Sequence, residues 1–341
     1  MIMNKGKAMV TQSEVAKKAG VSFITVSRVV NNKGNVKEKT KKRVLKVIKE
    51  LGYYPNSLGR GLNMNRTFTI GIIVPFTAHI FDTSYYIELL SGIETACAEQ
   101  NYHILLYPKK EEKEEIDYQR LFFERKADGL LIIAPEVDDE QIRSINDNSI
   151  PCVVVDGRQS YKNIIFIDSD NVKGAYLATE YLIKMGHKRI AFLGGWTFVR
   201  NGMDRRNGYL KALEKYSISR NDRYIMKGDF TEHSGYANMI TLLFLEERPT
   251  AVFAANDSMA IGAMSAIKEN GLKIPDDISI IGFDDIKMLH YLSPSLSTVK
   301  QFSYDMGYTA AGFLIQKINK RQVQSMIFKV ELKIRESVKG I

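Results

Sequence analysis

An alternation that begins at Phe68 limits the chain to a small set of folds. Short runs of β-branched and other apolar residues alternate with amphipathic stretches of roughly ten to eighteen residues. Such runs are typical of parallel strands, because helices cover both faces of the sheet and leave few positions for polar side chains. Strands are expected over residues 68–74, 103–107, 129–133, 152–155, 189–193, 251–255 and 278–282.

This part of the chain has about 275 residues, which is long for one sheet of this kind. The series of strands breaks near residues 164–168, and a new alternation of strand and helix begins at about Asn171. We therefore predict an α/β body of two doubly wound parallel-sheet lobes. A last helix over residues 304–320 and a last strand over residues 326–334 are expected to cross back between the lobes.

Positive charge is concentrated in the first fifth of the chain. The whole sequence has 48 Lys and Arg residues against 39 Asp and Glu residues, a formal net charge of +9. Residues 1–66 hold 15 of these bases and three acids, whereas the rest carries a balance of −3. A basic head on a near-neutral body predicts that the head alone binds a polyanion. The alternative is a lysine-rich surface that is only solvated.

The basic head has the pattern of a helix-turn-helix. Thr11 and Glu14 form a capping box, in which each side chain accepts a hydrogen bond from the backbone N–H of the other residue. The helix that they open ends at Gly20. Ser22 is expected to cap a second short helix over residues 23–30, and a glycine in the turn between two short helices is typical of this all-α motif.

A third helix completes the head. Apolar residues at helical spacing predict it from about residue 39 to residue 51, and Gly52 ends it. Its lysines are expected to touch DNA phosphates, which gives affinity and salt dependence without sequence information. Residues 10–54 are therefore assigned to a DNA-binding domain, and residues 1–9 to a disordered tail.

The second helix of such a unit enters the major groove, and the residues at its N-terminal end meet base edges. Arg28 can pair bidentately with guanine, while the hydroxyls of Ser22 and Thr25 can hold a phosphate oxygen. Phe23 and Ile24 face solvent, because the other side of the helix is already apolar. We interpret both as contacts to thymine methyl groups. The alternative is a pair of stray exposed hydrophobic residues.

These residues resemble the head of the lactose-repressor (LacI/GalR) family of regulators. The resemblance is carried by VTQSEVAKKAGVS (residues 10–22), TVSRVVN (residues 25–31), Asn35-Val36, Thr40, Arg43-Val44, Leu51-Gly52-Tyr53, Pro55-Asn56 and Arg60. It implies that Phe23, Ile24 and Arg28 read bases. It also implies supporting phosphate contacts from Ser22, Thr25, Ser27, Asn31 and Thr40.

Residues 55–66 are small, polar and poor in apolar side chains, as expected for a linker between domains. The resemblance identifies this segment as the family's hinge, which becomes a short helix on the operator. It places Arg60 among the DNA-binding residues and Leu62 as a wedge in the minor groove. Gly59 and Gly61 each disfavour a helix by about 1 kcal/mol relative to alanine. We therefore expect a hinge that is disordered unless DNA and a second subunit are both present.

In the body, polar side chains directly follow several predicted strands. Ligands of parallel sheets bind beyond the carboxyl ends of the strands, which face each other across a cleft in a two-lobed body. The candidates are Pro75, Asp156, Trp196, Asn256, Asp257, Asp284 and Asp285, with aromatic surface from Tyr85, Tyr86 and Phe230 near the same rim. Aromatic faces with a few fixed polar groups suit a small polyhydroxylated ligand. Because an Asn or Asp after a strand can instead cap the next helix, we give Asp257 that role and Asn256 and Asp284 the ligand role.

The family resemblance extends through the body, for example in Gly186-His187-Lys188-Arg189-Ile190, Ala255-Asn256-Asp257 and Gly282-Phe283-Asp284-Asp285. It implies a fold like that of periplasmic binding proteins for residues 67–341, which would bind the effector and form the dimer. The effector contacts that it implies are Tyr85, Tyr86, Arg205, Phe230, Asn256, Asp284 and Gln301, with Arg205 gripping sugar hydroxyls. Residues 77–84 depart from the family's usual pattern and are about two residues longer.

Other classes of protein find little support in the sequence. No Walker loop, nucleophile elbow, HExxH or CxxC pattern occurs and the five histidines lie far apart, so we expect no enzyme, no cofactor and no metal site. His187, at a helix end, is expected to cap that helix. Cys97 and Cys152 lie in apolar stretches and are expected to be buried thiols. A secreted solute-binding protein would need an export signal, and no apolar run could span a membrane, so we expect a cytoplasmic protein.

Together these features predict a homodimeric, ligand-responsive transcriptional repressor. Its operator should be near-palindromic, because the two-fold symmetry of the protein maps onto the DNA. Either direction of the ligand's effect on operator binding is compatible with the sequence. We expect a small sugar as effector and carbohydrate utilisation genes as targets, with a nucleobase, a nucleoside or a sugar phosphate as the alternative effector.

Overall fold

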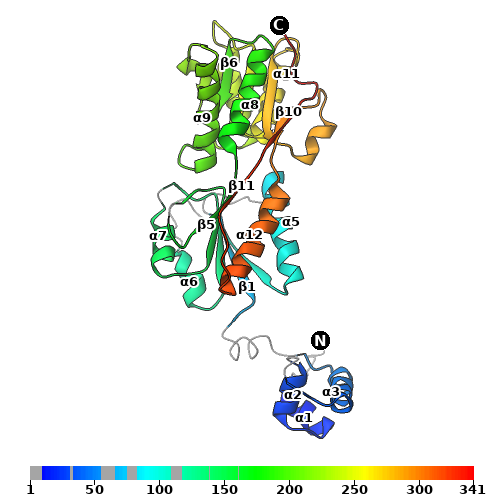
Figure 1. The fold of residues 1–341 in the computed structure, drawn as a ribbon. Helices are drawn as coiled ribbons and strands as arrows, with labels where there is room; N and C mark the ends of the chain where they lie inside the picture. The colour runs from blue at the N-terminus through cyan, green and yellow to red at the C-terminus, as the bar shows by residue number, and fades with distance from the viewer. Residues whose placement is uncertain are drawn as a thin grey trace, which may run out of the picture. The chain divides into compact units, whose positions relative to one another are not determined.

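The computed structural model describes residues 10–30, 34–54, 66–74, 83–108, 117–137, 139–159 and 161–341. The chain divides into two units, residues 1–67 and residues 68–341. The first contains the helical head, and the second is the α/β body (Figure 1). The expected tail over residues 1–9, the expected hinge contacts Arg60 and Leu62, the phosphate contact Asn31 and the strand-end candidate Pro75 lie outside the described residues.

Three helices form the described part of the head: α1 (Gln12–Ala19), α2 (Phe23–Val30) and α3 (Glu38–Leu51). All three were expected, and α3 begins one residue earlier than the apolar spacing indicates. Gly20 and Gly52 end α1 and α3 with φ angles of +63° and +62°. This left-handed conformation favours glycine, because a side chain would crowd the backbone there.

Side-chain caps and a small apolar core hold these helices. The capping box is confirmed, since Thr11 N–H donates to a Glu14 carboxylate oxygen at 2.6 Å and Glu14 N–H donates to Thr11 Oγ1 at 3.3 Å. The cap of α2 is confirmed as well, because Thr25 N–H donates to Ser22 Oγ at 3.2 Å. The residues buried in the core of the head are Val15, Ala16, Ala19, Val26, Val29, Val44, Val47 and Tyr53.

The first lobe of the body is a six-stranded sheet in the order β11-β5-β4-β3-β1-β2, in which all neighbouring pairs are parallel. Its strands are β1 (Thr69–Val74), β2 (His103–Pro108), β3 (Gly129–Ile133), β4 (Cys152–Val155), β5 (Ile165–Ser169) and β11 (Met326–Phe328). Its helices are α5 (Ser84–Glu99), α6 (Tyr118–Phe123), α7 (Glu140–Asp147) and α12 (Ser303–Ile318). Two separate apolar clusters, one with α5 and α12 and one with α6 and α7, cover the two faces.

The second lobe repeats this architecture in the order β12-β10-β9-β8-β6-β7, with only β12 antiparallel to its neighbour among the described strands. Its strands are β6 (Ile190–Leu193), β7 (Ile225–Met226), β8 (Ala251–Ala254), β9 (Ser279–Asp284), β10 (Ser297–Lys300) and β12 (Glu331–Lys333). Its helices are α8 (Asn171–Lys184), α9 (Arg200–Lys215), α10 (Glu232–Leu243) and α11 (Asp257–Glu269), with short 3-10 turns at η2 (Asp222–Tyr224) and η3 (Lys287–Tyr291).

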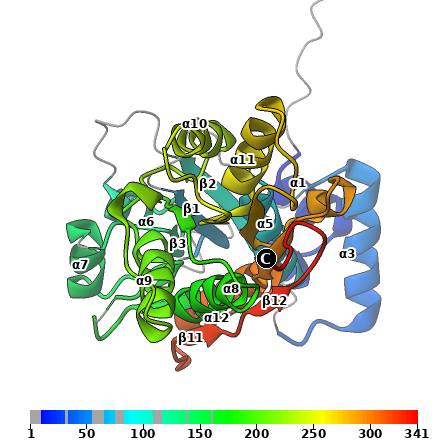
Figure 2. The ribbon, with the colours of Figure 1, turned by 90° about the horizontal axis from the view of Figure 1, so that it is seen from above.

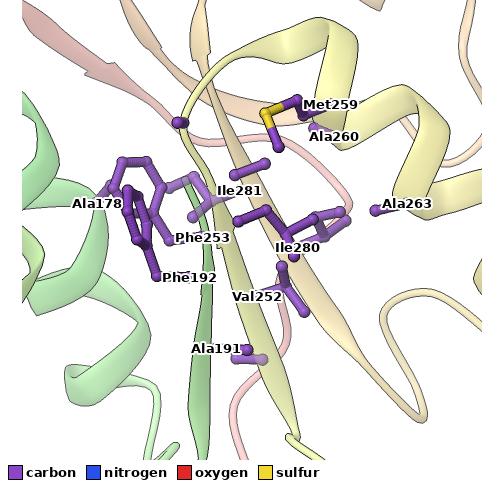
Figure 3. Close-up of a cluster of buried hydrophobic side chains, with 14 of the residues drawn as sticks. Ala178, Ala191, Phe192, Val252, Phe253, Met259, Ala260, Ala263, Ile280 and Ile281 are labelled. Atoms are coloured by element: carbon purple, nitrogen blue, oxygen red, sulfur yellow. The ribbon is translucent and has the colours of Figure 1, made fainter. Parts of the chain in front are cut away.

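Helices α8 and α9 lie together on one side of this second sheet, and α10 and α11 lie together on the other (Figure 2). Phe192 and Phe253 come from the paired strands β6 and β8, and their ring centroids are 5.4 Å apart in the core (Figure 3). Glycines allow the helices to approach closely: a Cβ added to Gly262 of α11 would lie 1.9 Å from the carbonyl oxygen of Glu232.

The two-lobed parallel body is confirmed, and the seven predicted strands are present with ends shifted by at most two residues. Three strands escape the apolar pattern. Strand β5 lies where the series was interpreted as broken, and β7 has only two residues. Strand β10 begins with the buried polar residues Ser297 and Thr298, which are tolerated because Ser337 Oγ accepts from Ser297 N–H at 2.8 Å and Thr298 Oγ1 donates to Asp257 at 2.6 Å.

The C-terminal segment crosses between the lobes. Helix α12 returns to the first lobe and packs against α5, as Figure 1 shows in orange and cyan. A Cβ added to Gly307 of α12 would lie 2.0 Å from the carbonyl oxygen of Leu89 in α5. The single last strand expected over residues 326–334 is wrong: β11 pairs with β5 of the first lobe and β12 with β10 of the second, because the chain passes from one sheet to the other.

The helix-capping role expected for His187 is confirmed for its backbone, because His187 N–H donates to the carbonyl oxygen of Leu182 in the last turn of α8 at 3.2 Å, but the side chain of His187 has another role. Its buried ring joins the second sheet to the C-terminal segment: Nδ1 lies 2.9 Å from Thr250 Oγ1, and Nε2 lies 3.1 Å from Ser279 Oγ and 3.0 Å from the carbonyl oxygen of Lys339. Burial lowers the pKa of His187. The side chain turns away from the end of α8 because partners from three distant segments satisfy both ring nitrogens.

Both cysteines, Cys97 and Cys152, are buried thiols, as expected. Burial raises the pKa of each thiol to about 12, which keeps both protonated. No helix in the described ranges is long and apolar enough to cross a membrane. The described residues also contain no group of three or more His, Cys, Asp or Glu side chains that could hold a metal ion.

Candidate functional site

Helix α2 turns one side to the core of the head and the other to solvent. Val26 and Val29 are buried, whereas Phe23 is 53% exposed and Ile24 is 61% exposed. Arg28 is exposed as well. An apolar pair beside an arginine can read base edges, through thymine methyl groups and through a bidentate bond to guanine. The structure therefore leaves the predicted base-reading side chains accessible, and their role stays a prediction.

Polar and basic groups surround this helix. Ser22 Oγ and Thr25 Oγ1 lie 2.9 Å apart at its start, and Thr40 lies in the first turn of α3. Ser27 is half-buried on α2. The exposed basic side chains of α3 are Lys39, Lys42, Arg43, Lys46 and Lys49. The groups expected to contact phosphates are thus arranged on the same small domain as the base-reading helix.

In the body, the predicted ligand residues come from strand ends in both lobes. Asp156 directly follows β4 of the first lobe, and Asp284 ends β9 of the second. The two carboxylates are close enough that each raises the pKa of Tyr86, which burial raises most. Arg205 of α9 opposes this rise. Asp156 of the first lobe and Asp284 and Arg205 of the second therefore lie close to the same side chain, Tyr86. We call the region between the lobes that these residues line the cleft.

Asp156 is a buried polar group on the first-lobe side of the cleft. Its backbone has φ of +57°, an uncommon left-handed conformation for a residue with a side chain. Tyr85 Oη donates a hydrogen bond to Asp156 Oδ2, and Asp156 Oδ1 is buried without a hydrogen-bond partner among the described residues. Burial and the nearby charge of Asp168 raise the pKa of Asp156 to about 7, although the Tyr85 bond and Arg205 oppose the shift.

Arg205 is buried in the second lobe and is held on several sides. Its Nε donates to Asn171 Oδ1 at 2.9 Å, and its Nη1 donates to the carbonyl oxygen of Ala255 at 2.6 Å. The guanidinium carbon lies 3.9 Å from the centroid of the Phe283 ring, and Nη1 lies 3.6 Å from Asp284 Oδ1. Such contacts fix the position of the cation before any ligand arrives.

Asp284 and Gln301 form the next pair in the cleft. Gln301 Nε2 donates to Asp284 Oδ1 at 2.6 Å, while Gln301 Oε1 is buried and has no hydrogen-bond partner in the part of the chain that the structure describes. Burial raises the pKa of Asp284 to about 6, against the opposing effects of Arg205 and Gln301. Asp284 also has a positive φ of +128°. The pair presents an unused acceptor in a low-dielectric position, where an unsatisfied polar group is costly.

Asn256 lies at the start of α11, where its side chain caps the helix. Asn256 Oδ1 accepts from Met259 N–H at 2.9 Å, and its Nδ2 donates to the carbonyl oxygen of Phe230 at 2.9 Å. The extended backbone of Asn256, with φ −148° and ψ 172°, is the conformation that an N-cap requires. The structure thus uses both ends of this amide to position Phe230 and the helix beside the cleft.

The capping role expected for Asp257 is therefore wrong. Its fully buried carboxylate accepts from the backbone N–H groups of Asp285 at 2.7 Å and Ile286 at 3.0 Å, and from the hydroxyl of Thr298. Asp257 is already inside α11, so its side chain points to the neighbouring strands instead of back to the first turn. It holds the loop after β9 and thereby the position of Asp284.

Aromatic rings line one side of the cleft in the second lobe. Phe230 has a positive φ of +69°, and the centroid of its ring lies 5.8 Å from the guanidinium carbon of Arg205. The ring centroids of Phe230 and Trp196 are 5.7 Å apart, and the two rings meet edge-on at 83°. Trp196 stacks on Phe198 at 5.7 Å and 22°. Sequence reasoning missed Phe198. The signal available was its position two residues after Trp196, in the segment between strand and helix.

Ion pairs that join the lobes were also missed. Arg158 of the first lobe pairs with Asp168 at 2.7 Å and reaches Asp204 of α9 in the second lobe at 3.7 Å. Lys287 of the second lobe lies 3.4 Å from Glu88 of α5. The sequence around a charged residue does not indicate which oppositely charged residue of a distant segment will form an ion pair with it. Arg158 lies two residues after a predicted strand-end candidate, which was the available hint.

A basic helix-turn-helix on the same chain as a two-lobed α/β body with a polar cleft defines a DNA-binding regulator and not an enzyme. The family model described as bacterial regulatory proteins, lacI family, matches residues 11–56. The model described as periplasmic binding protein-like domain matches residues 179–338.

Known proteins resemble the chain over nearly its whole length. The HTH-type transcriptional repressor PurR of Histophilus somni is 36% identical over 337 residues, which cover 98% of this chain and 100% of that protein. The structure of the lac repressor dimer bound to operator and the anti-inducer ONPF has a TM-score of 0.87 and 28% identity, covering 97% and 99% of the two chains. The complex of the transcriptional regulator CelR with cellobiose has a TM-score of 0.73 and 30% identity, covering 96% and 99%.

The chain therefore belongs to the LacI family and is a DNA-binding transcriptional repressor. Its fold is a helical helix-turn-helix head followed by two parallel α/β lobes like those of periplasmic binding proteins.

Proposed function

We propose that this repressor is a cytoplasmic homodimer whose operator affinity is controlled by a small, uncharged, hydroxyl-rich ligand in the cleft, most simply a sugar. The observation that carries the proposal is the pair of buried acceptors, Asp156 Oδ1 and Gln301 Oε1, which lack hydrogen-bond partners among the described residues. Buried polar atoms are normally satisfied, so two such atoms in one cleft call for a ligand that donates hydrogen bonds. A sugar supplies several hydroxyl donors at once.

The charge in the cleft favours an uncharged ligand over a phosphorylated one. Asp156 and Asp284 bring two carboxylates, against one guanidinium from Arg205. Two of the guanidinium nitrogens already donate hydrogen bonds to Asn171 and Ala255. Arg205 is the cation that acts on both carboxylates among the described residues, so the negative charge of a sugar phosphate would have no further described cation to balance it, and burying an unpaired charge is costly.

The ligand-contact roles follow from these positions. Tyr85, Tyr86 and Asp156 approach from the first lobe, and Trp196, Arg205, Phe230, Asn256, Asp284 and Gln301 from the second or from the crossover after β10. A ligand that touches both sets stabilises the arrangement in which the lobes are close. It changes operator affinity only by its differential affinity for the closed and open arrangements.

DNA recognition is assigned to α2. In this proposal Phe23, Ile24 and Arg28 of each subunit read one half of a near-palindromic operator, while hydroxyls and lysines of the head contact phosphates. The structure of a lac repressor dimer on its operator supports a dimeric arrangement by likeness. Roles for Arg60 and Leu62 in the hinge remain predictions from the resemblance.

A purine base is the second candidate effector. The specific observation in its favour is the 36% identity to repressors named PurR. A base also carries N–H donors that could reach the two acceptors, and it could stack on Phe230. It offers fewer donors than a sugar, however, and the row of rings beyond Phe230 is more extended than one base requires.

A thermal-shift screen of the full-length protein tests the two candidates together. The ligands are glucose, galactose, fructose, ribose, cellobiose, maltose and lactose, with hypoxanthine, guanine, adenine and glucose 6-phosphate as rivals. A ligand at 100 times its dissociation constant adds about 2.7 kcal/mol to the free energy of unfolding, which a melting curve resolves. We expect at least one uncharged sugar to raise the melting temperature.

Gln301→Leu should abolish that rise, because it removes one of the two unpaired acceptors. The matched control Gln322→Leu changes an exposed glutamine outside the cleft, and this variant should keep the rise in melting temperature that the ligand causes. Stabilisation by a purine base alone, or by glucose 6-phosphate alone, would show that the proposed effector class is wrong.

A further inference from the structure

Three aromatic rings form a continuous row that leads out of the cleft. Phe230 lies beside Arg205, Trp196 meets Phe230 edge-on, and Phe198 stacks on Trp196, with 5.7 Å between centroids at each step of the row. Phe230 and Trp196 are half-buried, whereas Phe198 is 41% exposed. The row therefore runs from the polar centre of the cleft towards solvent. A ligand with a single small ring bound beside Arg205 would contact only Phe230, at the inner end of this row of aromatic rings.

The segment that carries the outer rings is held firmly on both sides. Val199 is the N-cap residue of α9 and is 1% exposed. The carbonyl oxygen of Phe198 accepts a hydrogen bond from Val137 N–H of the first lobe at 3.1 Å, and Val199 forms a β-bridge with Glu136. Phe198 is thus exposed at a position whose backbone is fixed between two lobes. An exposed aromatic ring at a fixed position is costly for folding alone and is typical of a binding surface.

Polar groups lie beside the outer end of the row. Glu136 is exposed, and Gln159 Nε2 lies 3.5 Å from the carbonyl oxygens of both Glu136 and Val137. Aromatic rings with polar side chains on the neighbouring segment suit a sugar ring, whose C–H face is apolar and whose edge carries hydroxyls. A flat base stacks best between two parallel faces. The 83° angle between Trp196 and Phe230 provides no such slot.

We propose that Trp196 and Phe198 form a second sugar subsite, so that the effector has at least two linked rings: a disaccharide, a longer oligosaccharide or a glycoside. This inference rests on the proposed function, since it specifies which carbohydrates the same cleft takes. One ring occupies the polar centre near Arg205, and the next lies along Trp196 and Phe198. The backbone hydrogen bond from Val137 N–H to the Phe198 carbonyl oxygen joins the two lobes. A sugar ring that contacts Phe198 therefore also stabilises the closed arrangement of the lobes.

The test compares affinities for one and two rings by titration calorimetry with the full-length protein. The probes are cellobiose, maltose, lactose and sucrose, with glucose, galactose and fructose as their component rings. We expect one disaccharide to bind at least about tenfold more tightly than either of its components, which corresponds to about 1.4 kcal/mol. In Phe198→Ala, the ratio of the two affinities should fall by about tenfold, whereas Phe198→Tyr should keep it because it retains the ring.

Phe244→Ala is the matched control. Phe244 is 79% exposed at the C-terminal end of α10, and helix ends of this kind lie away from the carboxyl ends of the strands. The ratio should stay unchanged in this variant. Melting temperatures without ligand identify any variant that fails to fold, and Phe198→Tyr then provides the comparison.

Two outcomes are distinguishable from the expected one. If a single-ring sugar binds as tightly as every disaccharide, or if Phe198→Ala leaves the ratio unchanged, the second subsite does not exist and the proposed function stands. If no carbohydrate binds and a purine base does, the proposed function itself is wrong, and the inference falls with it.

Discussion

The carboxyl group of Asp156 makes the stability of the body depend on pH, and Asp156→Asn should remove the share of that dependence that Asp156 contributes. The side chain is 1% exposed, and its pKa rises from the ordinary 3.8 to about 7. The groups that face it are Tyr85 of α5, Asp168 of β5, Arg205 of α9 and Asp284 of β9. Since the folded protein binds this proton more tightly than the unfolded chain does, ionisation opposes folding.

The magnitude follows from the difference in pKa. A rise from 3.8 to about 7 corresponds to roughly 4 kcal/mol, lost progressively as the pH increases from about 4 to about 7 and constant above that. Asparagine has nearly the same shape, and its carbonyl oxygen can still accept from Tyr85. We therefore expect Asp156→Asn to be more stable than the natural protein at pH 8 by a few kcal/mol, with little difference near pH 4.

Urea unfolding of both proteins between about pH 4 and pH 8 measures this effect. The difference between the two curves reports Asp156 together with its interactions with Asp168 and Asp284, because the remaining carboxylates are common to both proteins. Asp276→Asn is the control: Asp276 is exposed, and a hydrogen bond from Lys339 lowers its pKa, so its titration lies below this window. Parallel stability curves for the natural protein and Asp156→Asn would refute the reasoning.

Two further predictions concern the head and the body. Arg28→Ala should cost about 1–3 kcal/mol of operator affinity and relax one base preference, measured by gel shift on a duplex selected from a random pool; unchanged affinity and selectivity would exclude base reading by Arg28. Gly307→Ala should strongly lower the melting temperature, because its Cβ would lie 2.0 Å from the Leu89 carbonyl oxygen. Gly312→Ala, on the same helix with no neighbouring atom within 4 Å, should be neutral or stabilising, and equal effects of the two alanines would contradict this packing.

Local signals identified most elements of the fold. The capping box of Thr11 and Glu14 and the glycines that end α1 and α3 involve residues only a few positions apart, so the chain itself contains both partners. Strands buried on both faces are recognisable because nearly all of their side chains are apolar. Strand β10 escaped for the opposite reason: its buried hydroxyl Thr298 is satisfied by Asp257, which lies 41 residues earlier.

The positions after the predicted strands also identified candidate site residues, but they did not show which role each residue has. Asn256 and Asp257 are adjacent, and either could cap α11 by composition. Asn256 does so, because the strand ends at Ala254 and the extended backbone falls on residue 256. Asp257 then points at loop N–H groups after β9, which the sequence cannot place beside it.

The sequence by itself determined the class of the protein: a basic helix-turn-helix, an alternation of strand and helix, and a long resemblance to one family. These depend on spacing along the chain. Only the tertiary structure decided which polar atoms in the cleft are already satisfied, leaving Asp156 Oδ1 and Gln301 Oε1 without partners in the described ranges. It also decided that Trp196 and Phe198 extend the row begun by Phe230. Hydrogen bonding and stacking act over a few ångströms in space, and those neighbours come from segments far apart in the sequence.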